Sequence, residues 1–299
     1  METFLIRPHF KDGHCGLYGA IIGDICGSIY EFNNRKTDKP EEIDLINSDC
    51  FFTDDTVLTV AVTEVAATAH ETKTTVDDYN KSLHKWGRKY PYKGYGNRFR
   101  GWLDSDDPKP YNSFGNGSAM RVSPIGYLFE EDQNHEGRYA CWREAERSAL
   151  PTHNHPEGIK GAQAVAWAIQ LARVSASQQS SLTQHNNEDK QKIAEMISVA
   201  FGYDLNQTLA QIRPHYKFDE TCQRTVPQAI IAFLESHDFV SAIQNAISIG
   251  GDSDTIACIT GSIAEAFYQE IPKELIEFAK SKLPDDIQKV MGYTLSGNK

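Results

Sequence analysis

The sequence lacks long apolar runs and has few basic residues. No stretch of about 18 consecutive apolar residues occurs, so no membrane-spanning helix is expected. The first residues, METFLIRPHFKDGHCG, contain no apolar segment of the length found in signal peptides. Lys and Arg number 30 against 41 Asp and Glu, which gives a net charge of −11. Such a chain repels nucleic-acid phosphates, so we expect no general nucleic-acid binding. The missing apolar segments lead us to expect a cytoplasmic protein without membrane binding.

Several familiar motifs are also missing. The six cysteines form no CxxC pair, which argues against a zinc site or a disulfide framework and favours buried free thiols. No GxSxG is present for a serine nucleophile. The glycine-rich stretch SFGNGSAMR (113–121) is not followed by Gly-Lys-Ser/Thr, so it is not a P-loop. Met120 stands where the dinucleotide fingerprint requires its third glycine.

Strand-like alternation is absent, and helical periodicity dominates instead. We predict an all-α fold in one compact multi-helix domain spanning residues 1–299. A polar segment without periodicity, residues 175–189, is predicted to be a surface loop that interrupts this domain without dividing it. The predicted helices are 16–30, 54–70, 76–89, 117–129, 136–148, 157–174, 188–202, 223–236, 239–248, 254–269 and 272–282.

The first of these helices carries three glycines at intervals of four residues. Gly19, Gly23 and Gly27 would leave a bare strip of backbone along one helix face. Glycine costs helix stability, so a second helix is expected to pack closely against this strip and compensate.

Two acidic stretches each precede an apolar helix: FFTDDT at 51–56 and GGDSDT at 250–255. Taken singly, each is typical of a helix start, with a capping threonine or a Gly-Gly turn and acids near the positive end of the helix dipole. Together they supply four carboxylates and two threonine hydroxyls, the oxygen ligands that hard divalent cations prefer. If the two starts meet in space, one or two Mg²⁺-like ions would offset the repulsion among the acids.

Three further features have a structural and a functional interpretation. The turn Gly-Asn-Gly-Ser at 115–118 is either a tight turn before a helix or a phosphate cradle of backbone N–H groups. The stretch THNHPEG (152–158) is more typical of a loop than of a metal site. Glu31 is either a solvated glutamate after a helix or a general acid or base.

Five ordered stretches resemble the ADP-ribosylglycohydrolase family. They are GAIIGDICGSIYE (19–31), FTDDT (52–56), GNGSAMRVSPIG (115–126), THNHPEG (152–158) and GGDSDTIACITGSIAEAFY (250–268). The resemblance implies an all-α fold with two Mg²⁺ ions at the base of a cleft, Mn²⁺ being an alternative. It implies as metal ligands Thr53, Asp54, Asp55, Asp252, Asp254 and Thr255. It implies as substrate-binding residues Phe114, Gly115, Asn116, Gly117, Ser118, His153 and Tyr268.

The activity implied by the resemblance is hydrolysis of the bond between ADP-ribose and an acceptor, with release of ADP-ribose. Glu31, Asp54, Asp55 and Asp254 are the expected catalytic residues, Glu31 transferring the proton, while Asp24 is expected to have a structural role. The partners would be ADP-ribose and an ADP-ribosylated substrate. Two other hypotheses remain: an ADP-ribose-binding or structural relative without turnover, and a metal-dependent phosphohydrolase. The acceptor is left open, with 93–102 and 104–112 as candidate rim loops.

Overall fold

The elements of the computed structural model are helices. It describes residues 17–32, 34–69, 73–129, 136–178 and 187–296. The α-helices are α1 (Tyr18–Gly27), α2 (Asp54–Ala66), α3 (Val76–Lys89), α4 (Asn97–Asp104), α5 (Gly117–Met120), α6 (Ser123–Leu128), α7 (Glu136–Ala149), α8 (Pro156–Gln178), α9 (Asn187–Phe201), α10 (Leu209–Ile212), α11 (Cys222–Leu234), α12 (Phe239–Ser248), α13 (Ser253–Tyr268), α14 (Lys273–Lys282) and α15 (Asp285–Ser296). A short 3-10 helix, η1, spans Pro40–Glu42. These ranges hold no strand beyond an isolated bridge between Gly115 and Thr221, so the all-α prediction is confirmed.

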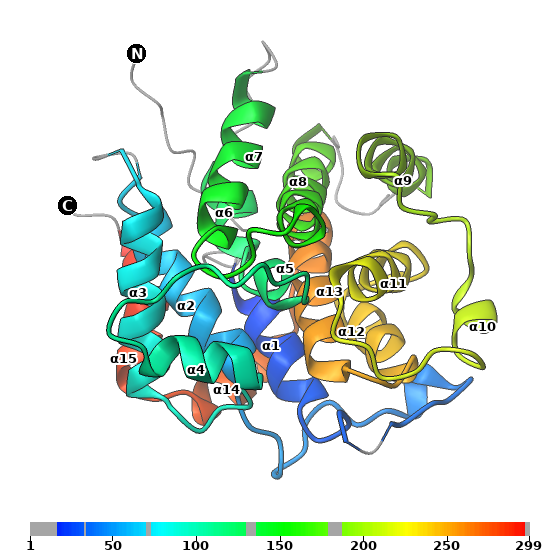
Figure 1. The fold of residues 1–299 in the computed structure, drawn as a ribbon. Helices are drawn as coiled ribbons and strands as arrows, with labels where there is room; N and C mark the ends of the chain where they lie inside the picture. Colours follow the sequence, from blue (N-terminus) through cyan, green and yellow to red (C-terminus); the bar gives the residue numbers. More distant parts are fainter. Residues whose placement is uncertain (1–16, 33, 70–72, 130–135, 179–186, 297–299) are drawn as a thin grey trace.

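Helices α1 and α13 lie side by side at the centre of the fold (Figure 1). All residues of both helices are buried. A Cβ added at Gly27 would lie 2.5 Å from the Asp254 Cα atom, and one at Gly19 would lie 2.8 Å from the Glu265 Cβ atom. The predicted close approach along Gly19, Gly23 and Gly27 is therefore confirmed, and the helix that packs there is α13.

The other helices surround this central pair. Helices α8, α11 and α12 pack against α13, while α2 and α14 pack against α1. Helices α3 and α15 cover α2, and α7 and α9 cover α8 (Figure 1). This arrangement brings the starts of α2 and α13, which are far apart in the sequence, to the same region of the core.

Several predicted elements have different bounds in the structure, such as the helix predicted over 54–70, which ends at Ala66. The helix predicted over 117–129 is divided into α5 and α6, because Pro124 lies in the first turn of a new helix and has no N–H to continue the earlier one. The prediction of a loop over 175–189 was wrong at both ends, since α8 continues to Gln178 and α9 begins at Asn187. Residues 179–186 lie outside the described residues.

The helices α4, α10 and α15 were not predicted. Helix α4 occupies part of the candidate rim loop 93–102, and its buried residues Phe99, Trp102 and Leu103 follow helical spacing. Within the described residues, no helix is both long and apolar enough to cross a bilayer. The described cysteines are buried, as predicted: Cys26, Cys50, Cys141, Cys222 and Cys258.

Candidate functional site

The start of α2 is a capped helix end. Thr53 has an extended backbone, with φ −113° and ψ −164°, and its Oγ1 accepts a hydrogen bond from the Asp55 N–H at 3.3 Å. Asp54 and Asp55 occupy the first turn, where the helix dipole favours negative charge. The capping interpretation of this stretch is thus confirmed, and the cap fixes where the two carboxylates leave the backbone.

The start of α13 is built differently. Gly250 and Gly251 have φ values of 75° and 74°, a left-handed conformation that glycine adopts readily. Asp252 occupies the N-cap position but makes no side-chain cap. Its Oδ2 instead accepts a hydrogen bond of 2.6 Å from the Asn116 amide. One oxygen of the Asp252 carboxylate is therefore tied to the turn at 115–118.

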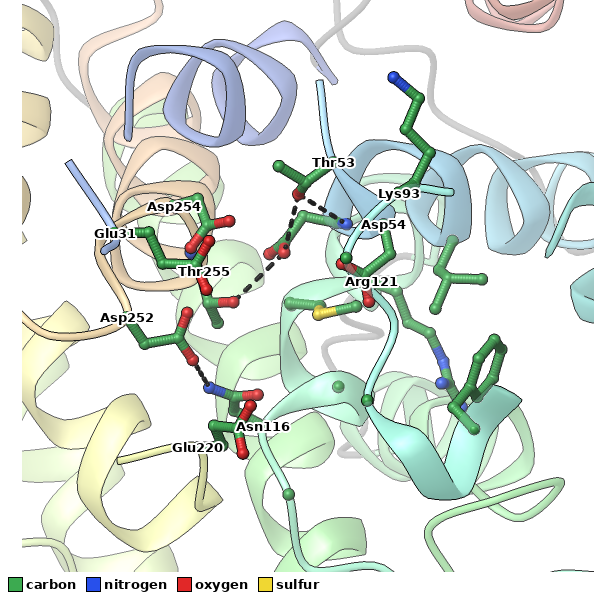
Figure 2. A pocket seen from close by; sticks show the side chains of 18 of the residues that line it. Glu31, Thr53, Asp54, Lys93, Asn116, Arg121, Glu220, Asp252, Asp254 and Thr255 are labelled. Atoms are coloured by element: carbon green, nitrogen blue, oxygen red, sulfur yellow. Dashed lines mark hydrogen bonds between the residues drawn. The ribbon is translucent and has the colours of Figure 1, made fainter. Parts of the chain in front are cut away.

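The two helix starts meet (Figure 2). The Thr255 hydroxyl on α13 donates to Asp55 Oδ2 on α2 at 3.2 Å. Carboxylate oxygens of Asp24, Asp55 and Asp254 lie within 4.8 Å of one another, and so do those of Glu31, Asp252 and Asp254. Asp254 belongs to both acidic clusters. The spatial condition for shared metal binding by the two stretches is met.

Asp24 on α1 holds the start of α2 in place. Its carboxylate accepts hydrogen bonds from the Thr53 N–H at 3.0 Å and from the Thr53 hydroxyl at 2.7 Å. It also accepts from the N–H of Thr56 at 3.0 Å and from the Thr56 hydroxyl. Four donors on one carboxylate fix the α2 start relative to α1, which agrees with the structural role expected for Asp24.

Burial and mutual repulsion raise the pKa values of these acids. Burial is the main cause for Asp55 and Asp254, whose pKa values lie well above the ordinary range, and neighbouring carboxylates add to it. The same two causes raise the pKa of Glu31 to about 7. Asp55 Oδ1 is buried and has no hydrogen-bond partner among the described residues. Buried, repelling carboxylates with an oxygen to spare fit the oxygen-rich site that a hard divalent cation requires.

Apart from Asp24, the residues of the two acidic clusters line a cavity of about 450 Å³ and form its floor. Its walls include Lys93 and Arg98 from the predicted rim stretch, and Gly115, Asn116 and His153. Phe32, Phe51 and Tyr92 also line it, although each is exposed. A cavity with an acidic floor, a glycine turn in its wall and aromatic rings at its mouth can hold a polar ligand with both anionic and planar parts.

The predicted substrate-binding residues take different positions in the structure. Gly115, Asn116, Gly117 and His153 line the cavity. Asn116 donates its amide N–H groups to Asp252 and to Thr225 Oγ1, so it also ties the glycine turn to the acidic floor. Phe114 is 42% exposed and lies beside His155 outside the cavity lining, so its contact with a ligand stays a prediction.

Two more of the predicted substrate-binding residues lie outside the cavity lining. Ser118 is fully buried, and its hydroxyl donates to the Gly158 carbonyl, so the side chain does not reach the cavity. Tyr268 ends α13, about 20 Å from Asp254 at the helical rise of ~1.5 Å per residue. Its hydroxyl contacts Lys190 and Ser236 there, so Tyr268 lies in a different part of the core and not at this cavity.

Some cavity residues were not singled out from the sequence. Arg121 follows the glycine turn and is fully buried, and Glu220 comes from the segment before α11. Arg121 could have been identified from the sequence, because a charged residue at a buried position of an apolar helical stretch is rare and needs partners. Glu220 has no such signal, since it lies in a polar connection whose path depends on the tertiary fold.

Comparisons with known proteins agree with one another. The profile of a family described as ADP-ribosylglycohydrolase matches residues 14–295. The chain is 26% identical to ADP-ribosylhydrolase ARH3 of Mus musculus, over 86% of this chain and 84% of that protein. It is 25% identical to ADP-ribosylarginine hydrolase Tri1 of Pseudomonas putida, over 87% and 72%.

Two further matches add to this. An uncharacterised protein of Archaeoglobus fulgidus is 29% identical over 56% of this chain, and the match spans about half of that protein's length, 53%. Among solved structures, one titled ADP-ribosylglycohydrolase-related protein complex superposes with a TM-score of 0.65 at 21% identity, over 94% of both chains. This structural likeness supports the same fold.

Proposed function

The chain belongs to the ADP-ribosylglycohydrolase family, and from this premise we propose that it is a metal-dependent hydrolase that releases ADP-ribose from an acceptor. The observation that carries the proposal is the position of Asp254, which shares in both acidic clusters at the floor of the cavity. The names of two relatives point to ADP-ribose in the substrate, while only one of them names an acceptor, arginine. The acceptor therefore stays open.

We propose that the acidic floor holds two Mg²⁺ ions, or Mn²⁺. Thr53, Asp54 and Asp55 would hold them from the α2 side, and Asp252, Asp254 and Thr255 from the α13 side. Bound there, the ions would supply Lewis-acid polarisation of ribose hydroxyls and of a water molecule. Asp24 would keep Thr53 and Asp55 in position, because it bonds the cap of α2.

The protein's own groups would complete the reaction. Gly115, Gly117 and His153 would bind the diphosphate and the adjoining ribose along the cavity wall. Cleavage of the bond at the distal ribose C1 would leave positive charge on the sugar, which the surrounding carboxylates would stabilise. A water molecule would form the new bond to C1 and give up one proton to solvent. Glu31 would transfer the proton to the departing acceptor, since it lies beside Asp252 and Asp254 and has a pKa raised to about 7.

A panel of ADP-ribosyl conjugates tests the proposal directly. The protein is incubated with arginine, serine, acetyl-ester and nucleobase conjugates, with Mg²⁺ or with EDTA, and the products are identified by mass. We expect intact ADP-ribose from at least one conjugate, with Mg²⁺ only. Release of AMP or phosphate would instead identify a phosphohydrolase. Tight ADP-ribose binding without release would identify a non-catalytic relative, and full activity after verified metal removal would contradict metal dependence.

The metal-free protein is expected to lose thermal stability as the pH rises. The folded state raises the pKa of Glu31 from about 4.5 to about 7 and also raises those of Asp55 and Asp254. Folding therefore favours the protonated forms of these acids. The part of the free energy of unfolding that comes from protonated Glu31 is lost between about pH 4.5 and 7. In EDTA, Tm should fall from about pH 5.5 to about pH 8, and saturating Mg²⁺ or Mn²⁺ should reverse the fall. Glu31→Gln should reduce the fall, and a flat or rising Tm would contradict the prediction.

A further inference from the structure

Arg121, Thr152 and His153 form a buried chain of hydrogen bonds that ends at the cavity wall. Arg121 Nη2 donates to Thr152 Oγ1 at 3.0 Å and to the Ser148 carbonyl at 3.0 Å. Thr152 Oγ1 lies 2.7 Å from His153 Nδ1. Arg121 and Thr152 are fully buried and His153 is 4% exposed. Arg121 and His153 line the cavity.

The direction of these bonds follows from counting protons. A guanidinium can only donate, so Thr152 Oγ1 accepts from Arg121. The pKa of Arg121 is lowered by burial only to about 10, so the group is charged at neutral pH. The Thr152 hydroxyl has one proton, and a buried hydroxyl needs an acceptor for it. His153 Nδ1 is the acceptor that the structure provides.

His153 therefore accepts at Nδ1 and carries its proton at Nε2. Burial, together with the nearby Arg121 and Arg98 charges, holds the pKa of His153 well below its usual range, so the ring is neutral. The Nε2 side faces the glycine turn, because a Cβ added at Gly117 would lie 3.3 Å from Nε2. The structure thus presents one N–H donor beside the turn that lines the cavity.

We propose that Arg121 and Thr152 are positioning residues that fix His153 as an Nε2–H donor toward an oxygen of the ligand held at the Gly115–Gly117 turn. The identity of that ligand, ADP-ribose, rests on the proposed function. The opposite tautomer would direct a lone pair at an ionised phosphate oxygen, which has no proton to donate, and would repel it. A hydroxyl at position 152 is thus needed for its proton, and not only for its volume.

Nitrogen NMR of the free protein tests the tautomer without any ligand. The His153 signals, assigned with His153→Ala, are expected to show a protonated Nε2 and an unprotonated Nδ1. Thr152→Val keeps the side-chain shape but removes the hydroxyl, and it should produce a mixture of tautomers. Thr152→Ser keeps the hydroxyl and should retain the wild-type pattern. A protonated Nδ1 in the wild type, or no change in Thr152→Val, would overturn the proposal.

Binding of ADP-ribose, measured by calorimetry, tests the consequence. Thr152→Val should raise Kd in inverse proportion to the fraction of His153 that keeps its proton at Nε2, about threefold where that fraction is one third. Thr152→Ser should keep the wild-type Kd. In a His153→Ala background, Thr152→Val should have no further effect, since its action passes through His153. Equal effects in both backgrounds would mean a merely structural role and would overturn the proposal. If the wild type does not bind ADP-ribose, the proposed function fails, while the NMR result still decides the tautomer.

Discussion

Replacing Asp254 by asparagine is expected to lower kcat/KM by about a thousandfold or more, which corresponds to roughly 4 kcal/mol of lost transition-state stabilisation. Asp254 is the residue that the two acidic clusters share, so its loss weakens both proposed metal positions together. Calorimetry with Mn²⁺ should show a matching loss of metal affinity. Activity is measured on the conjugate that the panel identifies.

The unfolding temperature of Asp254→Asn shows whether the substitution has damaged the metal site alone or the whole fold. Asparagine removes one of several repelling buried carboxylates, so the metal-free variant should unfold at the same temperature as the wild type or higher. Glu220→Gln is the matched control, because Glu220 lines the cavity but lies in neither cluster. It should keep metal affinity within a few-fold. Near wild-type activity of Asp254→Asn would contradict the proposed metal site.

Gly23→Ala is expected to lower the free energy of unfolding by about 3–5 kcal/mol, or to prevent folding. A Cβ at Gly23 would overlap the Ala257 carbonyl and lie 2.6 Å from the Cys258 backbone nitrogen. Backbone atoms cannot change rotamer, so α1 would have to move away from α13. The gain in helix propensity from alanine, about 1 kcal/mol, offsets only part of this cost. Urea unfolding measures the change.

Gly101→Ala on α4 is the control for this substitution. Gly101 is an exposed helical glycine with no atom within 4 Å of an added Cβ. The same change there should raise stability by about 0.5–1 kcal/mol through helix propensity alone. The error of such comparisons is roughly 1 kcal/mol. If the free energy of unfolding of Gly23→Ala lies within about that range of the wild-type value, the close contact of α1 with α13 is not a main source of stability.

Local chemistry could be predicted from the sequence, and long-range contacts could not. The Thr53 cap depends on three neighbouring residues and follows from their types. The contact of Asn116 with Asp252 depends on how the glycine turn packs across the core, and no local pattern encodes it. The oxygen ligands of the two acidic stretches suggested that they pair. Resemblance to a family supported the pairing, because spacing along the chain does not say which helix starts meet.

The position of Tyr268 away from the cavity could be predicted on physical grounds. The predicted helix 254–269 already separated Tyr268 from Asp254 by about 20 Å at the ordinary rise per residue, too far for one small cavity. The break between α5 and α6 was also foreseeable, since Pro124 interrupts the predicted helix. The burial of Ser118 could not be predicted, because a serine after a glycine turn is equally consistent with a cap, a ligand contact or a core hydrogen bond.

The contact between α1 and α13 also has a mechanical consequence. Gly27 packs against the backbone of Ser253 and Asp254. Asp24, about one turn earlier in α1, forms hydrogen bonds with the start of α2. The separation between the acidic groups is thus set by a backbone contact with α13 and by hydrogen bonds from the buried Asp24 carboxylate to α2. Such close-packed interiors have low compressibility. The floor of the cavity behaves as a stiff frame. The part of the site that can change shape is the cavity mouth, where exposed rings such as Phe32 and Tyr92 have room to move.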